Sequence, residues 1–146
     1  MTRSHPQRPF APSPPGSLLK RATVPTTTAR TSHHGDADDY LRLVRAAPCL
    51  CCGMEPSEAC HVRFASAAYG KASGLQKKPG PEWVLPLCAG CHRLNRDAQH
   101  NRGEREFWEK LGIDPLPTCV ALFAQRGDLV AMRAVVFHTI MNRRKT

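Results

Sequence analysis

Two pairs of cysteines have the spacing of a metal site. Cys49 and Cys52 form one C-x-x-C turn, and Cys88 and Cys91 form a second one. Each such turn directs two thiolates at one ion, and two turns complete the tetrahedral four-cysteine site that structural zinc prefers. We therefore expect these cysteines to bind zinc. The alternative is that they are unrelated buried or reactive thiols.

Three further cysteines bring the total to seven. An odd number of cysteines, with closely spaced pairs and no secretory signal, argues against a disulfide framework. Cys51 is a spare thiol that could replace a neighbouring ligand, whereas Cys60 and Cys119 are expected to pack as small apolar side chains. The zinc site by itself predicts structure and says little about function.

Three histidines could supply the groups that phosphodiester hydrolysis requires. That reaction needs a base that deprotonates water and a cation that offsets the charge on the leaving oxygen. His61 lies in a segment with strand character, and His92 and His100 follow the last cysteine of the zinc pattern. A histidine on a strand that faces a helix carrying others would combine both parts. The alternative for a lone histidine is an ordinary core residue.

The stretch from Cys49 to Pro115 resembles one family of nucleases. The matching segments are Cys49-x-x-Cys52-Gly53, Pro56-Ser57-Glu58-Ala59-Cys60-His61-Val62-Arg63-Phe64, Gly70-Lys71, Lys78-Pro79, Pro86-Leu87-Cys88-x-x-Cys91-His92, Gln99-His100, Gly103-Glu104, Phe107-Trp108 and Gly112-Ile113-Asp114-Pro115. This series is similar to the HNH (ββα-metal) endonucleases of phages and prophages. Within that family it is most similar to the recombination-enhancement (Ref-type) nucleases.

The resemblance implies a metal-dependent endonuclease that hydrolyses DNA. His61 would be the general base, and His92 and His100 would bind the catalytic metal. That metal is expected to be Mg²⁺ or Mn²⁺, although histidine ligands also suit zinc, nickel or cobalt. A recombinase filament is a further partner that the Ref-type comparison raises.

Two features depart from the HNH pattern. Many members of the family carry an acidic metal ligand just before the base, whereas this chain has Cys60 there, and a thiol is a poor Mg²⁺ ligand. The central Asn of the family is also absent. Our hypothesis is that Glu82 helps to position His61 or the metal.

The spacing of His92 and His100 carries a structural expectation. Eight residues on an unbroken helix correspond to about 12 Å of rise, which is too far for one metal ion. We therefore expect an interruption near residues 95–97, with Asp97 capping a new turn that carries His100.

The chain is strongly basic, with 21 Lys+Arg against 12 Asp+Glu and a net charge of +9. This balance favours a polyanionic partner such as DNA. Arg63, Lys71, Lys77 and Lys78 surround the predicted strands and are expected to contact phosphates. The alternative is an ordinary solvated surface. Nothing in the sequence indicates base-edge recognition, so little sequence preference is expected.

The elements that must position these groups predict a small α+β fold. Residues 58–64 and 83–87 read as two short strands, and residues 104–111 as a helix that ends at Gly112. A short helix is expected to begin at Asp38 and Asp39. After Thr118 the pattern predicts two more helical pieces, hinged at residues 127–128.

We expect three parts along the chain. These are a disordered, basic Pro/Thr-rich tail over residues 1–38, a zinc-stapled ββα-metal (HNH) domain over 39–116 and a helical extension over 117–146. No apolar run approaches the ~18 residues of a membrane span. Because no secretory signal is recognisable either, a cytoplasmic location in a bacterial or phage-infected cell is expected. An acid-free, Arg-containing start would also suit an organellar transit peptide.

Two other functional classes stay open at this stage. One is a zinc-bound nucleic-acid-binding module that does not cut, which Cys60 and the missing Asn favour. The other is a zinc-dependent protein-interaction domain, in which the basic charge is incidental. His61 together with His92 favours the nuclease, because a protein that only binds needs neither histidine.

Overall fold

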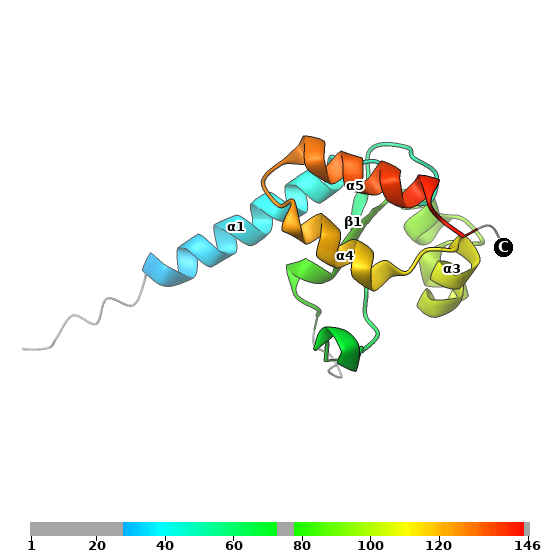
Figure 1. Ribbon diagram of the computed structural model, residues 1–146, viewed down its shortest axis with the longest axis horizontal. Helices are drawn as coiled ribbons and strands as arrows, with labels where there is room; N and C mark the ends of the chain where they lie inside the picture. The colour runs from blue at the N-terminus through cyan, green and yellow to red at the C-terminus, as the bar shows by residue number, and fades with distance from the viewer. Residues whose placement is uncertain (1–27, 73–77, 145–146) are drawn as a thin grey trace, which may run out of the picture.

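A two-stranded antiparallel hairpin lies at the centre of the fold. In the computed structural model, which describes residues 28–72 and 78–144, β1 (Glu58–His61) pairs with β2 (Val84–Leu87). The register places Glu58 opposite Leu87 and His61 opposite Val84. Helices surround this hairpin, so the predicted α+β class is confirmed (Figure 1).

Both strands are shorter than the sequence predicts. The Val62 N–H still donates to the Trp83 carbonyl at 2.9 Å, but the Arg63 N–H donates to the Glu104 carboxylate at 2.8 Å. Trp83 itself ends a 3₁₀ turn, η2 (Pro81–Trp83). The ladder stops here because a side chain from a later helix takes the next backbone donor.

Helix α1 (Thr28–Arg45) is longer than the sequence suggests. It includes residues 28–38, so the expectation that this stretch is disordered is wrong; residues 1–27 of the expected tail lie outside the described residues. Tyr40 and Val44 anchor the C-terminal half of the helix in the core, and the N-terminal half projects from the body (Figure 1). Once the anchored half is helical, each further residue extends the helix without a new nucleation cost.

The segment after β2 contains the predicted interruption. A π-helical turn, η3 (Gly90–Leu94), is followed by a separate short helix, α2 (Gln99–Arg102). The expected role of Asp97 is wrong, because the N-cap position of α2 is Ala98. The Asp97 carboxylate instead forms an ion pair with Arg102.

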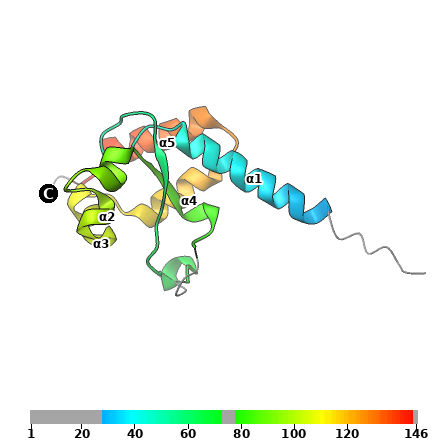
Figure 2. The same cartoon turned by 180° about the vertical axis from the view of Figure 1, so that it is seen from behind.

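Helix α3 (Glu104–Leu111) has the predicted bounds. Gly112 ends it in the left-handed conformation (φ 70°), with its N–H bonded to the Trp108 and Glu109 carbonyls. Phe107 and Trp108 are buried, which confirms that they belong to the core. From behind the molecule, α2 and α3 lie together at one end of the hairpin (Figure 2).

The C-terminal part forms two helices, as predicted. These are α4 (Pro115–Ala124) and α5 (Leu129–Met141), and each begins with an aspartate that caps it: Asp114 accepts from the Leu116 N–H and Asp128 from the Ala131 N–H. The expected boundary at residue 117 therefore falls inside α4. No helix among the described residues is long and apolar enough to cross a membrane.

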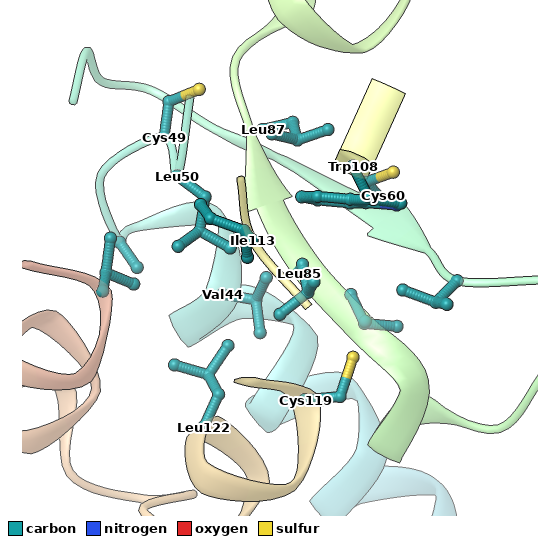
Figure 3. Packing of buried hydrophobic residues seen from close by; sticks show 14 of the residues in the cluster. Val44, Cys49, Leu50, Cys60, Leu85, Leu87, Trp108, Ile113, Cys119 and Leu122 are labelled. Atoms are coloured by element: carbon teal, nitrogen blue, oxygen red, sulfur yellow. The ribbon is translucent and has the colours of Figure 1, made fainter. Parts of the chain in front are cut away.

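One hydrophobic core joins these elements. Leu85 of β2 lies among side chains from α1 and α4, including Val44 and Leu122, and Trp108 of α3 belongs to the same cluster (Figure 3). Met132 of α5 is also fully buried in it. The C-terminal helices are thus part of the domain that contains the hairpin.

Candidate metal centre and histidine site

The four predicted cysteines come together in space. The Sγ atoms of Cys49, Cys52, Cys88 and Cys91 all lie within 4.8 Å of one another, and those of Cys52 and Cys88 are 3.6 Å apart. Tetrahedral zinc–sulfur bonds of about 2.3 Å imply sulfur–sulfur separations of about 3.8 Å. The cluster could therefore hold a metal ion such as zinc.

Local backbone geometry builds this cluster. The Gly53 N–H donates to the Cys49 carbonyl at 2.7 Å, and Gly53 has a φ of 75°, which a residue with a side chain rarely adopts. The Leu50 N–H donates to the Pro86 carbonyl at 3.0 Å. This bond attaches the first turn to β2, directly before the second turn begins at Cys88.

The thiol chemistry of the cluster also points to a cation. Burial raises the pKa of Cys49 to about 11 and raises that of Cys91. Burial alone would also raise the pKa of Cys88, but hydrogen bonds from the Cys91 N–H and from neighbouring thiols lower it. Four thiolates at this separation repel one another, and a bound divalent ion would offset that repulsion and displace the remaining protons.

The other three cysteines lie in two kinds of environment: Cys51 is partly exposed, and Cys60 and Cys119 are buried. Cys51 is half-buried, and its Sγ does not belong to the group of four Sγ atoms that lie within 4.8 Å of one another. Cys60 and Cys119 are 1% and 0% exposed, which confirms that they are packed in the core. Burial raises the pKa of Cys60 to about 12, so this residue does not stand in for an acidic metal ligand.

The break between η3 and α2 brings His92 and His100 together. Their ring centroids lie 4.5 Å apart, with the planes inclined at 78°. The Asn101 side chain holds this folded-back arrangement, because its Nδ2 donates to the Asn95 carbonyl at 2.8 Å and to the Arg93 carbonyl at 3.4 Å. Two histidines that a continuous helix would separate thus become neighbours.

Glu58 is a site residue that sequence reasoning missed. Its Oε2 lies 2.6 Å from His92 Nδ1, and Arg93 Nη2 donates to Oε1 at 2.8 Å. A carboxylate can only accept, so Nδ1 carries a proton, and Nε2 is the ring nitrogen that faces away from Glu58. Hydrogen bonds from Arg93 and then His92 lower the pKa of Glu58 to about 2. The hairpin register was the available signal, since it places position 58 opposite Leu87, beside the second cysteine turn.

His61 lies at the end of β1 with its side chain half-buried. Burial, and then the positive charges of Lys78 and Arg63, lower its pKa to about 4. The ring is therefore neutral at pH 7 and can accept a proton.

Lys71 does not lie where the sequence suggested. It is 4% exposed, and its Nζ donates to the Phe64 carbonyl at 2.8 Å and lies 5.7 Å from the centre of the Trp83 ring. An ammonium group enclosed in this way cannot reach a DNA phosphate, so that prediction is wrong. Lys71 instead stabilises the loop that follows β1.

Two of the other predicted phosphate-binding residues remain candidates. Arg63 and Lys78 are exposed, and their charges act on His61. Lys77 lies outside the described residues. A cationic rim of this kind beside a neutral histidine suits a phosphodiester substrate.

Glu82 is not brought to His61 or to the histidine pair. Its carboxylate folds over Gly80, where a Cβ atom built on the glycine would collide with it. Burial raises the pKa of Tyr40 in α1, and the charge of Glu82 adds to that rise. Glu82 therefore lies towards α1, and the acid that contacts His92 is Glu58.

Among the described residues, the four cysteines are the one group in which three or more metal-ligating atoms lie within 4.8 Å. His92 and His100 form a pair. Comparisons with protein-family models, with curated proteins and with solved structures find no match for this chain. The chemistry of the site is therefore that of its own residues: a neutral imidazole at His61, the His92–His100 pair, of which Glu58 orients His92, and the two exposed cations Arg63 and Lys78.

Proposed function

We propose that this chain is a metal-dependent endonuclease of the HNH type, which hydrolyses DNA phosphodiester bonds with His61 as its general base. The single observation that carries the proposal is the pairing of His92 and His100 at 4.5 Å, with His92 oriented by Glu58 of β1, the strand that also carries His61. A protein that only bound zinc or DNA would gain nothing from this arrangement.

His61 would remove the proton from the attacking water, since its neutral ring has a free lone pair at pH 7. Arg63 and Lys78 would hold the phosphate beside it through their charges. A divalent cation bound by His92 and His100 would offset the negative charge that develops on the leaving oxygen.

The donor set bears on which cation would fit. Glu58 is occupied by His92 and Arg93, so the candidate ligands are imidazoles. Imidazole nitrogen suits Co²⁺, Ni²⁺ or Zn²⁺ best, and Mn²⁺ binds it more weakly than these ions, whereas Mg²⁺ prefers oxygen. We therefore propose that a transition metal binds at the histidine pair, and we expect Mn²⁺ to support activity better than Mg²⁺.

A plasmid-nicking assay tests this function. Zinc-loaded protein would be incubated with supercoiled DNA and with Mg²⁺, Mn²⁺, Co²⁺ or Ni²⁺ in turn. We expect nicking with at least one transition metal, and a rate roughly 10²- to 10⁴-fold lower for His61→Ala. His138→Ala is the matched control, because His138 is an exposed histidine of α5. Equal cutting by all three proteins, or no cutting by any, would contradict the proposal.

The alternative function is a zinc-bound nucleic-acid-binding module that does not cut. It is favoured by one observation: no third ligand atom joins His92 and His100 within 4.8 Å in the part of the chain that the structure describes. DNA binding without cutting in the presence of each of the metals would support this alternative.

Because the Ref-type resemblance suggests a recombinase partner, the cutting assay should also include recombinase-coated single-stranded DNA as a substrate.

A further inference from the structure

A cavity of about 610 Å³ lies between the loop that follows β1, helix α3 and the start of α4. Its size falls within the range of small-ligand sites, about 300–1,000 Å³. Apolar and aromatic side chains line it, and charged groups stand at its rim. The apolar lining includes Phe64, Tyr69, Trp108, Ile113 and Leu116, and the charged groups are Arg105, Glu109, Asp114 and Arg144.

One wall of the cavity is already a stacking arrangement. The Arg105 guanidinium lies 4.4 Å from the centre of the Phe64 ring. Planar aromatic and guanidinium groups of this kind are the surfaces on which unpaired nucleobases stack. Arg144 adds a second cation, and its backbone is held by a 3.0 Å bond to the Gly112 carbonyl.

The carboxylate of Asp114 supplies an acceptor at the rim. Its Oδ1 accepts from the Leu116 N–H at 3.2 Å, which fixes the side chain at the start of α4. A carboxylate can accept hydrogen bonds from the exocyclic amino groups of adenine, cytosine or guanine, whereas thymine has no such group.

The cavity is close in the chain to the base of the proposed reaction. Phe64 follows His61 by three residues, and the Glu104 carboxylate ties the intervening Arg63 backbone to α3. A DNA strand whose phosphate lies at His61 would therefore carry a neighbouring nucleotide towards the cavity.

We infer that this cavity binds one unstacked nucleobase, so that the preferred DNA is single-stranded or locally unpaired. The inference rests on the proposed function for the identity of the ligand, and it adds the form of DNA. A base in a stacked, paired duplex could not enter such a cavity without leaving the helix.

Binding without added catalytic metal tests the inference separately from cutting. The full-length, zinc-loaded protein would be titrated into fluorescently labelled single-stranded oligonucleotides and into blunt duplexes, with anisotropy as the readout. Arg105→Ala removes the stacked guanidinium, and Ala65→Leu adds volume inside the cavity without changing charge. Arg126→Ala is the matched control, because Arg126 stacks on Phe123 at 4.6 Å outside the cavity.

We expect Arg105→Ala and Ala65→Leu to weaken single-strand binding by roughly 5- to 100-fold, the range for loss of one base-stacking contact. Arg126→Ala should weaken single-strand and duplex binding only slightly and to the same extent. Asp114→Asn keeps a helix-capping side chain but removes the charge. It should reduce any preference for oligo(dC) or oligo(dA) over oligo(dT).

The inference fails if Arg105→Ala binds single strands as Arg126→Ala does while Ala65→Leu binds them as wild type. Thermal unfolding of each variant would verify that it is folded. If the wild type binds single strands through the cavity but never cuts, the proposed nuclease function fails and this inference stands. If the wild type cuts DNA and the cavity variants bind single strands as the wild type does, this inference fails and the proposed nuclease function stands.

Discussion

The carboxylate of Glu58 connects the hairpin to the histidine pair through a single side chain. Its Oε2 accepts from His92 Nδ1, and Arg93 donates to both oxygens, so the imidazole is held in one orientation. Carboxylate–histidine pairs of this kind fix a metal ligand before the metal arrives. In the proposed function, Glu58 would therefore be a positioning residue that acts through His92.

Replacing Glu58 with Gln should loosen His92 while preserving the size of the side chain. We expect the affinity for Mn²⁺ or Ni²⁺ at the histidine pair to fall about 10- to 100-fold. Metal titration of nicking activity and calorimetry of metal binding would measure it. Glu106→Gln is the control, since Glu106 also pairs with an arginine, Arg102 at 3.1 Å, but contacts no histidine. Equal losses in both variants would contradict the role of Glu58.

The pKa of His61 should make stability depend on pH in a predictable direction. Because the pKa is about 4 in the folded chain and about 6.5 in model peptides, between these values the unfolded state binds a proton that the native state does not. The free energy of unfolding therefore falls as pH decreases from about 7 to about 5.

His61→Gln removes this contribution, so its free energy of unfolding should fall less over the same range. Urea denaturation of both proteins at saturating zinc would measure the difference, since the other titrating groups are common to both. Parallel stability curves for wild type and His61→Gln would show that burial does not hold the ring neutral.

At the scale of elements, the decisive feature is the interruption between η3 and α2. The Asn101 side-chain amide donates to the Arg93 and Asn95 carbonyls, and the Asn95 carbonyl also accepts from the Ala98 N–H at 3.0 Å. This contact spans the break and keeps His92 near His100. The element is small and lies partly at the surface, so few apolar contacts support it.

Asn101→Ala should separate the two histidines without unfolding the core. We expect a loss of about 1 kcal/mol in local stability, faster amide exchange over residues 90–102 and weaker metal binding at the pair. Hydrogen exchange followed by mass spectrometry would resolve the segment. In Asn142→Ala, the control, a similar amide bond to the His138 carbonyl is lost at the end of α5, so residues 90–102 should exchange as in wild type. Unchanged amide exchange over residues 90–102 in Asn101→Ala would show that the Asn101 side chain does not hold His92 near His100.

At the scale of the whole molecule, the two-stranded sheet is too small to fold on its own. The cysteine cluster joins the turn before β1 to the turn after β2, and the helices α1, α4 and α5 complete the core around Leu85. Metal binding at this cluster would therefore be coupled to core formation, because neither turn is held in place before the chain folds.

Removing zinc should unfold the domain cooperatively. Structural zinc is worth about 10–16 kcal/mol in comparable small sites, which exceeds the stability of most small domains. We expect one zinc per chain, and loss of the circular-dichroism melting transition with a chelator or in Cys52→Ser. Cys51→Ser should retain the bound zinc and the melting transition, because Cys51 does not belong to the group of four cysteines. A chelated protein that melts as before would contradict this coupling.

The sequence alone was enough for features that depend on local spacing. The cysteine pairs predicted the metal cluster because each pair lies within one turn. Gly112 predicted the end of α3 because its left-handed conformation is a local requirement. The break between His92 and His100 followed from helix geometry, once both were expected at one site.

Tertiary structure alone decided the features that depend on contacts between distant segments. Glu58 reaches His92 only because of the hairpin register, and Lys71 is buried only because the loop after β1 folds over it. The helical span of residues 28–38 depends on anchoring of α1 in a core built from later residues. In these cases composition was a poor guide, because the free energy of long-range packing outweighs local preference.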